Sequence, residues 1–193
     1  MTFRPFLAAA LLLLPVAGCT PRRLPGTDIR DTEETRAILD PRYFDFLLEH
    51  HGVLLEVQPL ERREEGDKVL RKVRYRPKPV IASVGPKPVP PEWFAFVETS
   101  TYDKKRRELT FQNVPTSGAI SRMVVNTGTL RLRDAGGGQT ERTMDGEISL
   151  KLPFLMKPLA MIGEQVIKSE GLKILDGELP VLNRFIAEVL RQG

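Results

Sequence analysis

Residues 140–186 read TERTMDGEISLKLPFLMKPLAMIGEQVIKSEGLKILDGELPVLNRFI, and this stretch decides the fold of the chain. Its first part alternates polar and apolar residues, which predicts a β-strand with one buried face. Pro153 ends that strand, and the apolar residues that follow recur at helical spacing. Two glycines and Pro180 interrupt the helical pattern, so we expect a long C-terminal helix with a bend or break near residues 176–180.

The segments upstream predict strands that pair as antiparallel hairpins. Alternating residues on both sides of a turn at residues 64–67 predict the first hairpin. The second hairpin spans residues 93–114 and turns at DKKRRE, and the third joins residues 118–133 to residues 141–152 across DAGGGQT. Charged or glycine-rich turns between alternating segments are typical of hairpins. The sequence therefore predicts six successive antiparallel strands.

Two short helices are expected before these strands. The segment DTEETRAILDPRYFDFLLEHHG, residues 31–52, begins with possible capping residues and places acids in the first turn. Pro41 forces a break between the two helices. The second helix is expected over residues 40–51 and stops at Gly52, and a short strand is expected around residues 28–30.

This order of elements resembles the START-like superfamily, also called SRPBCC or polyketide-cyclase-like, whose members have the helix-grip fold. The segment TRAILDPRYFDFLLEHHG resembles the opening of that fold, and residues 140–186 resemble its close. The resemblance covers about residues 28–190. It implies an α+β domain over residues 28–193, in which a curved antiparallel sheet of six to seven strands wraps around a long C-terminal helix. A cavity for an apolar ligand often lies between sheet and helix in such folds.

Strand and helix periodicity selects candidate residues for the wall of this cavity. They are Val97, Thr99, Thr101, Phe111, Asn126, Ile148, Leu150, Leu159, Ile162 and Val166. The same pattern would also fill an ordinary core. Polar side chains that face an apolar interior need a hydrogen-bond partner, and a ligand, buried water or backbone could supply it. Glu98 is offset by one from the candidates on its strand, so we expect it to face outward.

The N-terminal segment predicts membrane attachment. Residues 1–18 have the basic start, short apolar run and small-residue end of a secretory signal, and the run is too short to span a bilayer. The sequence Val-Ala-Gly-Cys at its end resembles the lipobox of bacterial lipoproteins, which implies cleavage before Cys19 and acylation of that residue. The alternatives are an ordinary secreted protein or an uncleaved anchor. Residues 19–27 are expected to form a tether.

The same resemblance implies a location outside the cytoplasm. Thr20 follows the cysteine, which resembles the class sorted to the outer membrane in some Gram-negative bacteria. We therefore expect the periplasmic leaflet of the outer membrane in a Gram-negative source. In any other source we expect the outer face of the cytoplasmic membrane.

Composition and motif content exclude several other functions. The formal charge is +4 and the basic residues are interspersed with acids, which argues against nucleic-acid binding. Cys19 is the only cysteine, so disulfides and thiol chemistry are not expected. His50 and His51 are adjacent and cannot both face one metal or nucleophile. The AGGGQ segment, residues 135–139, lacks the following helix of a phosphate loop. We therefore expect no metal, no cofactor and no catalytic constellation.

Three functions remain open from the sequence. The first is a lipid-anchored envelope protein, not expected to be an enzyme, that binds or carries an apolar ligand such as a lipid. The second is a cyclase-like or hydrolytic enzyme, for which Arg71, Tyr75 or Arg122 would supply a buried ionisable group. The third is an adaptor with a filled core, which would bind a protein through a sheet edge or the proline-rich segment 77–91. That segment is equally interpretable as a lid or as an edge cover.

Overall fold

A computed structural model describes residues 22–27, 31–79, 83–84, 87–88, 91–121, 124–150, 174 and 176–192. Its strands are β1 (Arg22–Thr27), β2 (Leu54–Glu65), β3 (Lys68–Pro77), β4 (Ser83–Val84), β5 (Lys87–Pro88), β6 (Phe96–Asp103), β7 (Glu108–Pro115), β8 (Val124–Gly136) and β9 (Gln139–Leu150). Its helices are α1 (Asp31–Leu39), α2 (Arg42–His50), α3 (Gly118–Ser121) and the 3-10 helix η2 (Pro91–Phe94). Residues 176–185 are also helical and continue into the π-helical turn η4 (Ile186–Leu190).

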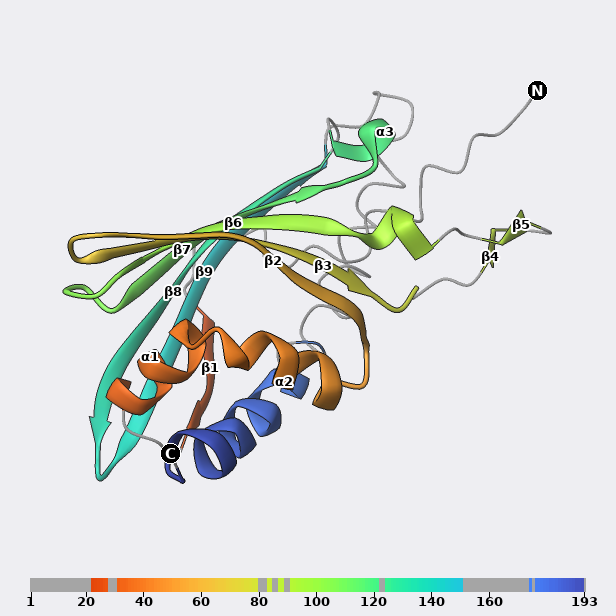
Figure 1. Ribbon diagram of the computed structural model, residues 1–193. Helices are drawn as coiled ribbons and strands as arrows, with labels where there is room; N and C mark the ends of the chain where they lie inside the picture. Colours follow the sequence, from red (N-terminus) through yellow and green to blue (C-terminus); the bar gives the residue numbers. More distant parts are fainter. Residues whose placement is uncertain are drawn as a thin grey trace.

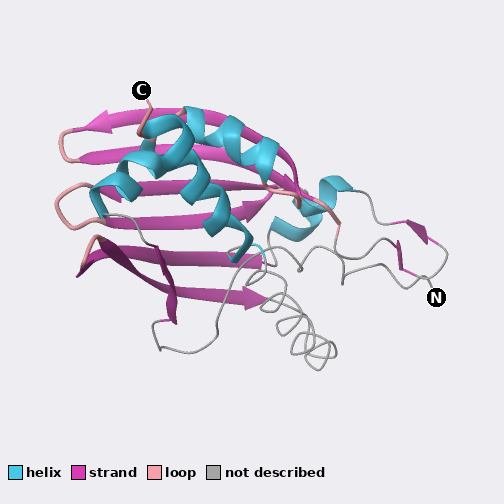
Figure 2. Ribbon diagram, turned by 90° about the horizontal axis from the view of Figure 1, so that it is seen from below, coloured by secondary structure: helices cyan, strands magenta, loops and turns pink. Residues whose placement is uncertain are grey.

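Seven strands form one antiparallel sheet in the order β1-β9-β8-β7-β6-β3-β2. The helices α1 and α2 and the C-terminal helix cover one face of this curved sheet (Figures 1 and 2). The three predicted hairpins are present, although residues 93–94 belong to η2 and residues 118–121 to α3 and not to the expected strands. The glycines at the first and third turns, such as Gly66, have positive φ angles that other residues rarely adopt, and the second turn has Arg107 at a positive φ. The α+β architecture expected from the sequence is therefore confirmed.

The core lies between the sheet and the helices that cover it. Val69 and Tyr102 on the sheet are fully buried, and so are Leu182 and Phe185 on the C-terminal helix. Phe185 also packs edge-on against Tyr43 of α2, with 5.2 Å between ring centroids. These contacts connect the two ends of the sequence and hold the C-terminal helix against the sheet.

Two expectations for the ends of the domain require correction. The expected tether includes residues 22–27, but these residues form β1, which pairs with β9 at the edge of the sheet. A bend or break of the last helix was expected near residues 176–180, and no break is present there, because residues 176–185 are helical throughout. The expected strand at residues 28–30 and the first part of the last helix lie outside the described residues.

Candidate functional site

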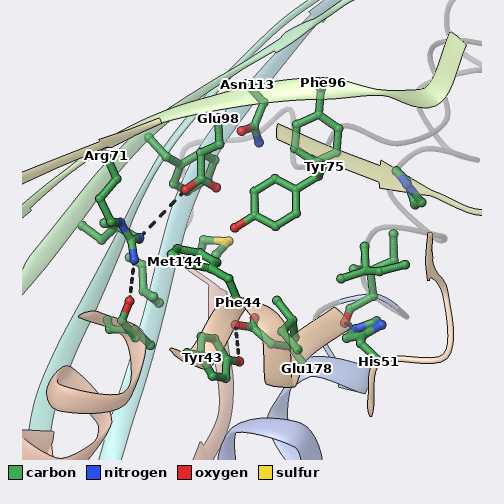
Figure 3. Close-up of a pocket in the computed structure, with 18 of the residues that line it drawn as sticks. Tyr43, Phe44, His51, Arg71, Tyr75, Phe96, Glu98, Asn113, Met144 and Glu178 are labelled. Carbon is green, nitrogen blue, oxygen red and sulfur yellow. Dashed lines mark hydrogen bonds and ion pairs between the residues drawn. The ribbon is translucent and has the colours of Figure 1, made fainter. Parts of the chain in front are cut away.

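A cavity of about 180 Å³ lies between the concave face of the sheet and the helices (Figure 3). An apolar cavity of about 150 Å³ suffices to bind benzene, so this one can accommodate a small ring with a substituent. Much of its lining is aromatic or aliphatic. These residues include Phe44, Leu47, Tyr75, Phe96, Leu109, Phe111, Leu130 and Met144.

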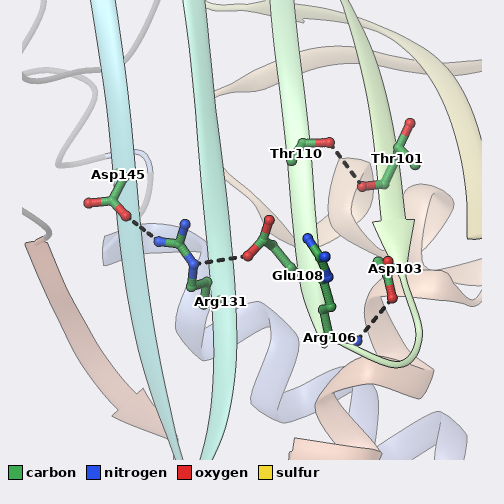
Figure 4. Close-up of polar contacts among 7 residues, drawn as sticks. All are labelled: Thr101, Asp103, Arg106, Glu108, Thr110, Arg131 and Asp145. Atoms are coloured by element: carbon green, nitrogen blue, oxygen red, sulfur yellow. Dashed lines mark hydrogen bonds and ion pairs between the residues drawn. The ribbon is translucent and has the colours of Figure 1, made fainter.

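Only one of the predicted cavity residues with a described side chain lines this cavity, and it is Phe111 of β7. Val97, Thr99 and Thr101 lie on the other face of β6, because Phe96 and Glu98 line the cavity and side chains alternate along a strand. Thr99 is accordingly exposed. Figure 4 shows Thr101 near the ion pairs of this outer face, where Thr110 donates a hydrogen bond to its carbonyl oxygen.

The other candidates are distributed differently. Asn126 of β8 is fully buried on the inner face of the sheet, opposite Asn113, but it does not line the cavity. Ile148 and Leu150 are on β9, opposite residues 126 and 124, but their side chains lie outside the described set. Leu159, Ile162 and Val166 also lie outside the described residues, as do Arg122 and Cys19.

Arg71 of β3 is one of the three ionisable residues that the sequence analysis names as candidates for the interior. Its guanidinium donates a hydrogen bond to the carbonyl oxygen of Ile38 and lies 5.6 Å from the ring centroid of Phe44. It also lies 4.0 Å from a carboxylate oxygen of Glu98. A buried positive charge therefore forms part of the cavity wall (Figure 3).

Glu98 of β6 points into the cavity, contrary to the expectation that it faces outward. Its side chain is 17% exposed. Burial raises its pKa, and the positive charge of Arg71 and a hydrogen bond from Ser100 offset this only in part. The sequence was misleading here because apolar residues occupy both parities of this strand, with Phe96 on one side and Val97 on the other.

A second charged group lies on the opposite side of the cavity. Arg142 of β9 pairs with Glu34 of α1 at 3.0 Å and lies 3.9 Å from Glu178 of the C-terminal helix. Tyr43 donates a hydrogen bond to Glu178 at 3.1 Å. Burial raises the pKa of Tyr43 well above its ordinary value, and the negative charge of Glu178 adds to this effect. This network connects both ends of the domain to the sheet.

Tyr75 of β3 lies between the two charged groups. Its ring stacks on Phe96 at a centroid distance of 5.3 Å, and Figure 3 shows its hydroxyl directed into the cavity. Burial raises its pKa well above the ordinary value, and the charge of Glu98 contributes, so the phenol stays protonated. Its hydroxyl has no hydrogen-bond partner in the part of the chain that the structure describes. It is therefore available to a ligand.

The two adjacent histidines do not act together. His51 lines the cavity, and its Nε2 lies 3.1 Å from the carbonyl oxygen of Ile174. The Nδ1 atom of His50 instead lies 2.9 Å from the carbonyl oxygen of Phe46.

Within the described ranges, no three His, Cys, Asp or Glu side chains gather in a way that could hold a metal ion. No described helix is both long and apolar enough to cross a membrane.

Solved structures share this architecture across nearly the whole chain. The Zhui aromatase/cyclase of a Streptomyces strain matches with a TM-score of 0.56 and 11% identity, over 90% of this chain and 96% of that one. Norcoclaurine synthase from Thalictrum flavum, in complex with dopamine and hydroxybenzaldehyde, matches with a TM-score of 0.57 and 12% identity, over 98% and 95%. The chain has the helix-grip fold. At identities of 11% and 12%, the similarity to these structures shows the fold alone. No family model and no curated protein matches the sequence.

Proposed function

We propose that the chain is a lipid-anchored envelope protein that binds a small, largely apolar molecule in its helix-grip cavity. The observation that carries the proposal is the Tyr75 hydroxyl, which has no partner among the described residues and points into an aromatic-lined space. Ligand pockets are typically apolar with a few polar groups that fix orientation. One helix-grip neighbour, norcoclaurine synthase, was solved in complex with dopamine and hydroxybenzaldehyde, which are single-ring compounds. The presence of a cavity counts against the adaptor with a filled core.

Native mass spectrometry of the full chain, released from membranes in mild detergent, tests this proposal. We expect a discrete bound mass that the variant Leu130→Trp loses, because Leu130 lines the cavity and the indole would fill it. Thr99→Trp is the matched control, since Thr99 is exposed on the outer face of the sheet. A spectrum without ligand after incubation with envelope extract, or equal loss in both variants, would contradict the binding function.

The lipid anchor is the second part of the proposal, and the sequence around Cys19 supports it. One acyl chain holds a protein only weakly at a membrane, whereas two or more hold it firmly. Cells grown with radiolabelled palmitate should label the wild-type chain and leave the Cys19→Ala variant unlabelled. Label in both chains, or in neither, would show that Cys19 is not the attachment site.

A buried carboxyl group favours an acid–base enzyme as the second candidate function. Burial raises the pKa of Glu98, and a cavity acid with a raised pKa is a recurrent feature of active sites. The names of the two neighbours, an aromatase/cyclase and a synthase, also describe enzymes. In the same mass measurement, Glu98→Gln distinguishes the two functions. An enzyme would accumulate a different bound mass, its unconverted substrate, while a binding protein would keep the wild-type mass.

A further inference from the structure

The register of the sheet places three polar side chains level with one another on the concave face. Glu98 of β6 is directly opposite Asn113 of β7, and Asn113 is directly opposite Asn126 of β8. These three residues are called the polar row. Asn113 is 8% exposed and Asn126 is fully buried. Glu98 and Asn113 both line the cavity and point into it in Figure 3.

The amides of the polar row have unmet hydrogen-bonding capacity. The Oδ1 atom of Asn113 and both amide atoms of Asn126 are buried and have no hydrogen-bond partner among the described residues. Buried polar groups in native proteins nearly always have a partner, which can be protein, water or ligand. On one side of the polar row the next level of the sheet is apolar, with Tyr75 opposite Phe96 and Phe96 opposite Pro115. On the other side Arg71 is opposite Ser100, and both are buried. The polar row therefore lies between an apolar level of the wall and the level of the Arg71 guanidinium.

The charges around the cavity indicate what kind of group would bind there. Both arginines that line the cavity already have a carboxylate within 4.0 Å. Arg71 has Glu98, and Arg142 has Glu34 and Glu178. A ligand anion at the polar row would lie beside Glu98, with no unpaired arginine among the described lining residues to compensate it. A ligand cation would have to compete with the arginines for the same carboxylates. An uncharged group avoids both costs.

We propose that the two cavity-lining residues of the polar row, Glu98 and Asn113, bind the polar end of the ligand, and that this end is an uncharged carboxamide or lactam on a small ring. Such a group both donates and accepts hydrogen bonds, as the side-chain amide of Asn113 does. The ring then lies against the aromatic wall formed by Tyr75, Phe96 and Phe111. This inference rests on the proposed binding function and specifies its ligand class.

Four single-ring probes of similar size test the ligand class. They are benzamide, benzoate, benzylamine and toluene, titrated into the full chain in detergent with the ¹³C-methyl signal of Met144 as the readout. Met144 lines the cavity, so a ligand inside it shifts this signal. We expect benzamide to bind about tenfold more tightly than benzoate or benzylamine, with free concentrations corrected for uptake into empty micelles.

Variants of the polar row connect this preference to its residues. Asn113→Leu should remain folded, since it removes a buried amide oxygen that has no partner among the described residues, and should weaken benzamide binding about fivefold while toluene binding stays within twofold. Asn126 does not line the cavity, so Asn126→Leu should have a smaller effect on benzamide binding. Gln112→Leu, at an exposed position of the same strand as Asn113, should change the affinity for neither probe. If toluene binds but benzamide has no advantage, or Asn113→Leu leaves that advantage intact, the inference is overturned and the binding function stands. If no probe shifts the Met144 signal, the binding function fails as well.

Discussion

Replacing Arg142 by methionine should lower the free energy of unfolding by about 3–5 kcal/mol, the typical cost of removing one partner of a buried ion pair. Methionine retains much of the volume of arginine but removes the guanidinium. Glu34, which is fully buried, would then lose the positive charge that lies 3.0 Å from its carboxylate. Glu178 would lose the same charge and with it part of the contact that holds the C-terminal helix to the sheet. Urea unfolding followed by circular dichroism measures the change.

Arg184 provides the matched control for this substitution. It pairs with Glu188 one helical turn away, and both side chains are about half exposed, so Arg184→Met should destabilise the domain far less than Arg142→Met. In a double-mutant cycle, the loss of stability in the variant that carries both Arg142→Met and Glu34→Gln should be much smaller than the sum of the losses in the two single variants. Equal losses for Arg142→Met and Arg184→Met would show that the buried network does not stabilise the domain.

The order of elements could be predicted from the sequence because it depends on local signals. Alternation, turn residues and prolines act within a few positions, and the hairpins that they predict are present. Arg22–Thr27 has no such signal, because Pro25 and Gly26 lie within this short segment and its strand conformation depends on pairing with β9. Whether this segment joins the sheet depends on β9, which is far away in the sequence, so the segment alone does not predict it.

The candidate site was predicted less well for a related physical reason. Which face of β6 is buried depends on its neighbours, and its apolar residues fall on both faces. The polar row depends on register across three strands, so no window of sequence shows Glu98 beside Asn113. One residue of the polar row could be identified from the sequence. Asn126 was expected to face the interior, and it is fully buried. Sequence patterns thus identified the sheet, while its register determined the site.

Replacing Gly128 by alanine should lower the free energy of unfolding by about 1–3 kcal/mol and reduce ligand binding. Gly128 of β8 is directly opposite Phe111, whose ring lies across the glycine. A Cβ atom at this position would overlap the Cζ atom of Phe111 and lie 2.8 Å from the carbonyl oxygen of Asp145. The ring must then move, and because Phe111 lines the cavity its displacement changes the space available to the ligand.

Urea unfolding and the Met144 methyl titration with toluene measure both consequences of Gly128→Ala. Gly52→Ala is the control, because a Cβ atom there meets no other atom within 4 Å. Adding Phe111→Leu to Gly128→Ala should recover part of the lost stability, since it removes the overlapping ring but not the contact with Asp145. If Gly128→Ala behaves like Gly52→Ala in both measurements, the ring of Phe111 does not depend on the glycine. The shape of this cavity wall would then be set by the helices and not by the sheet.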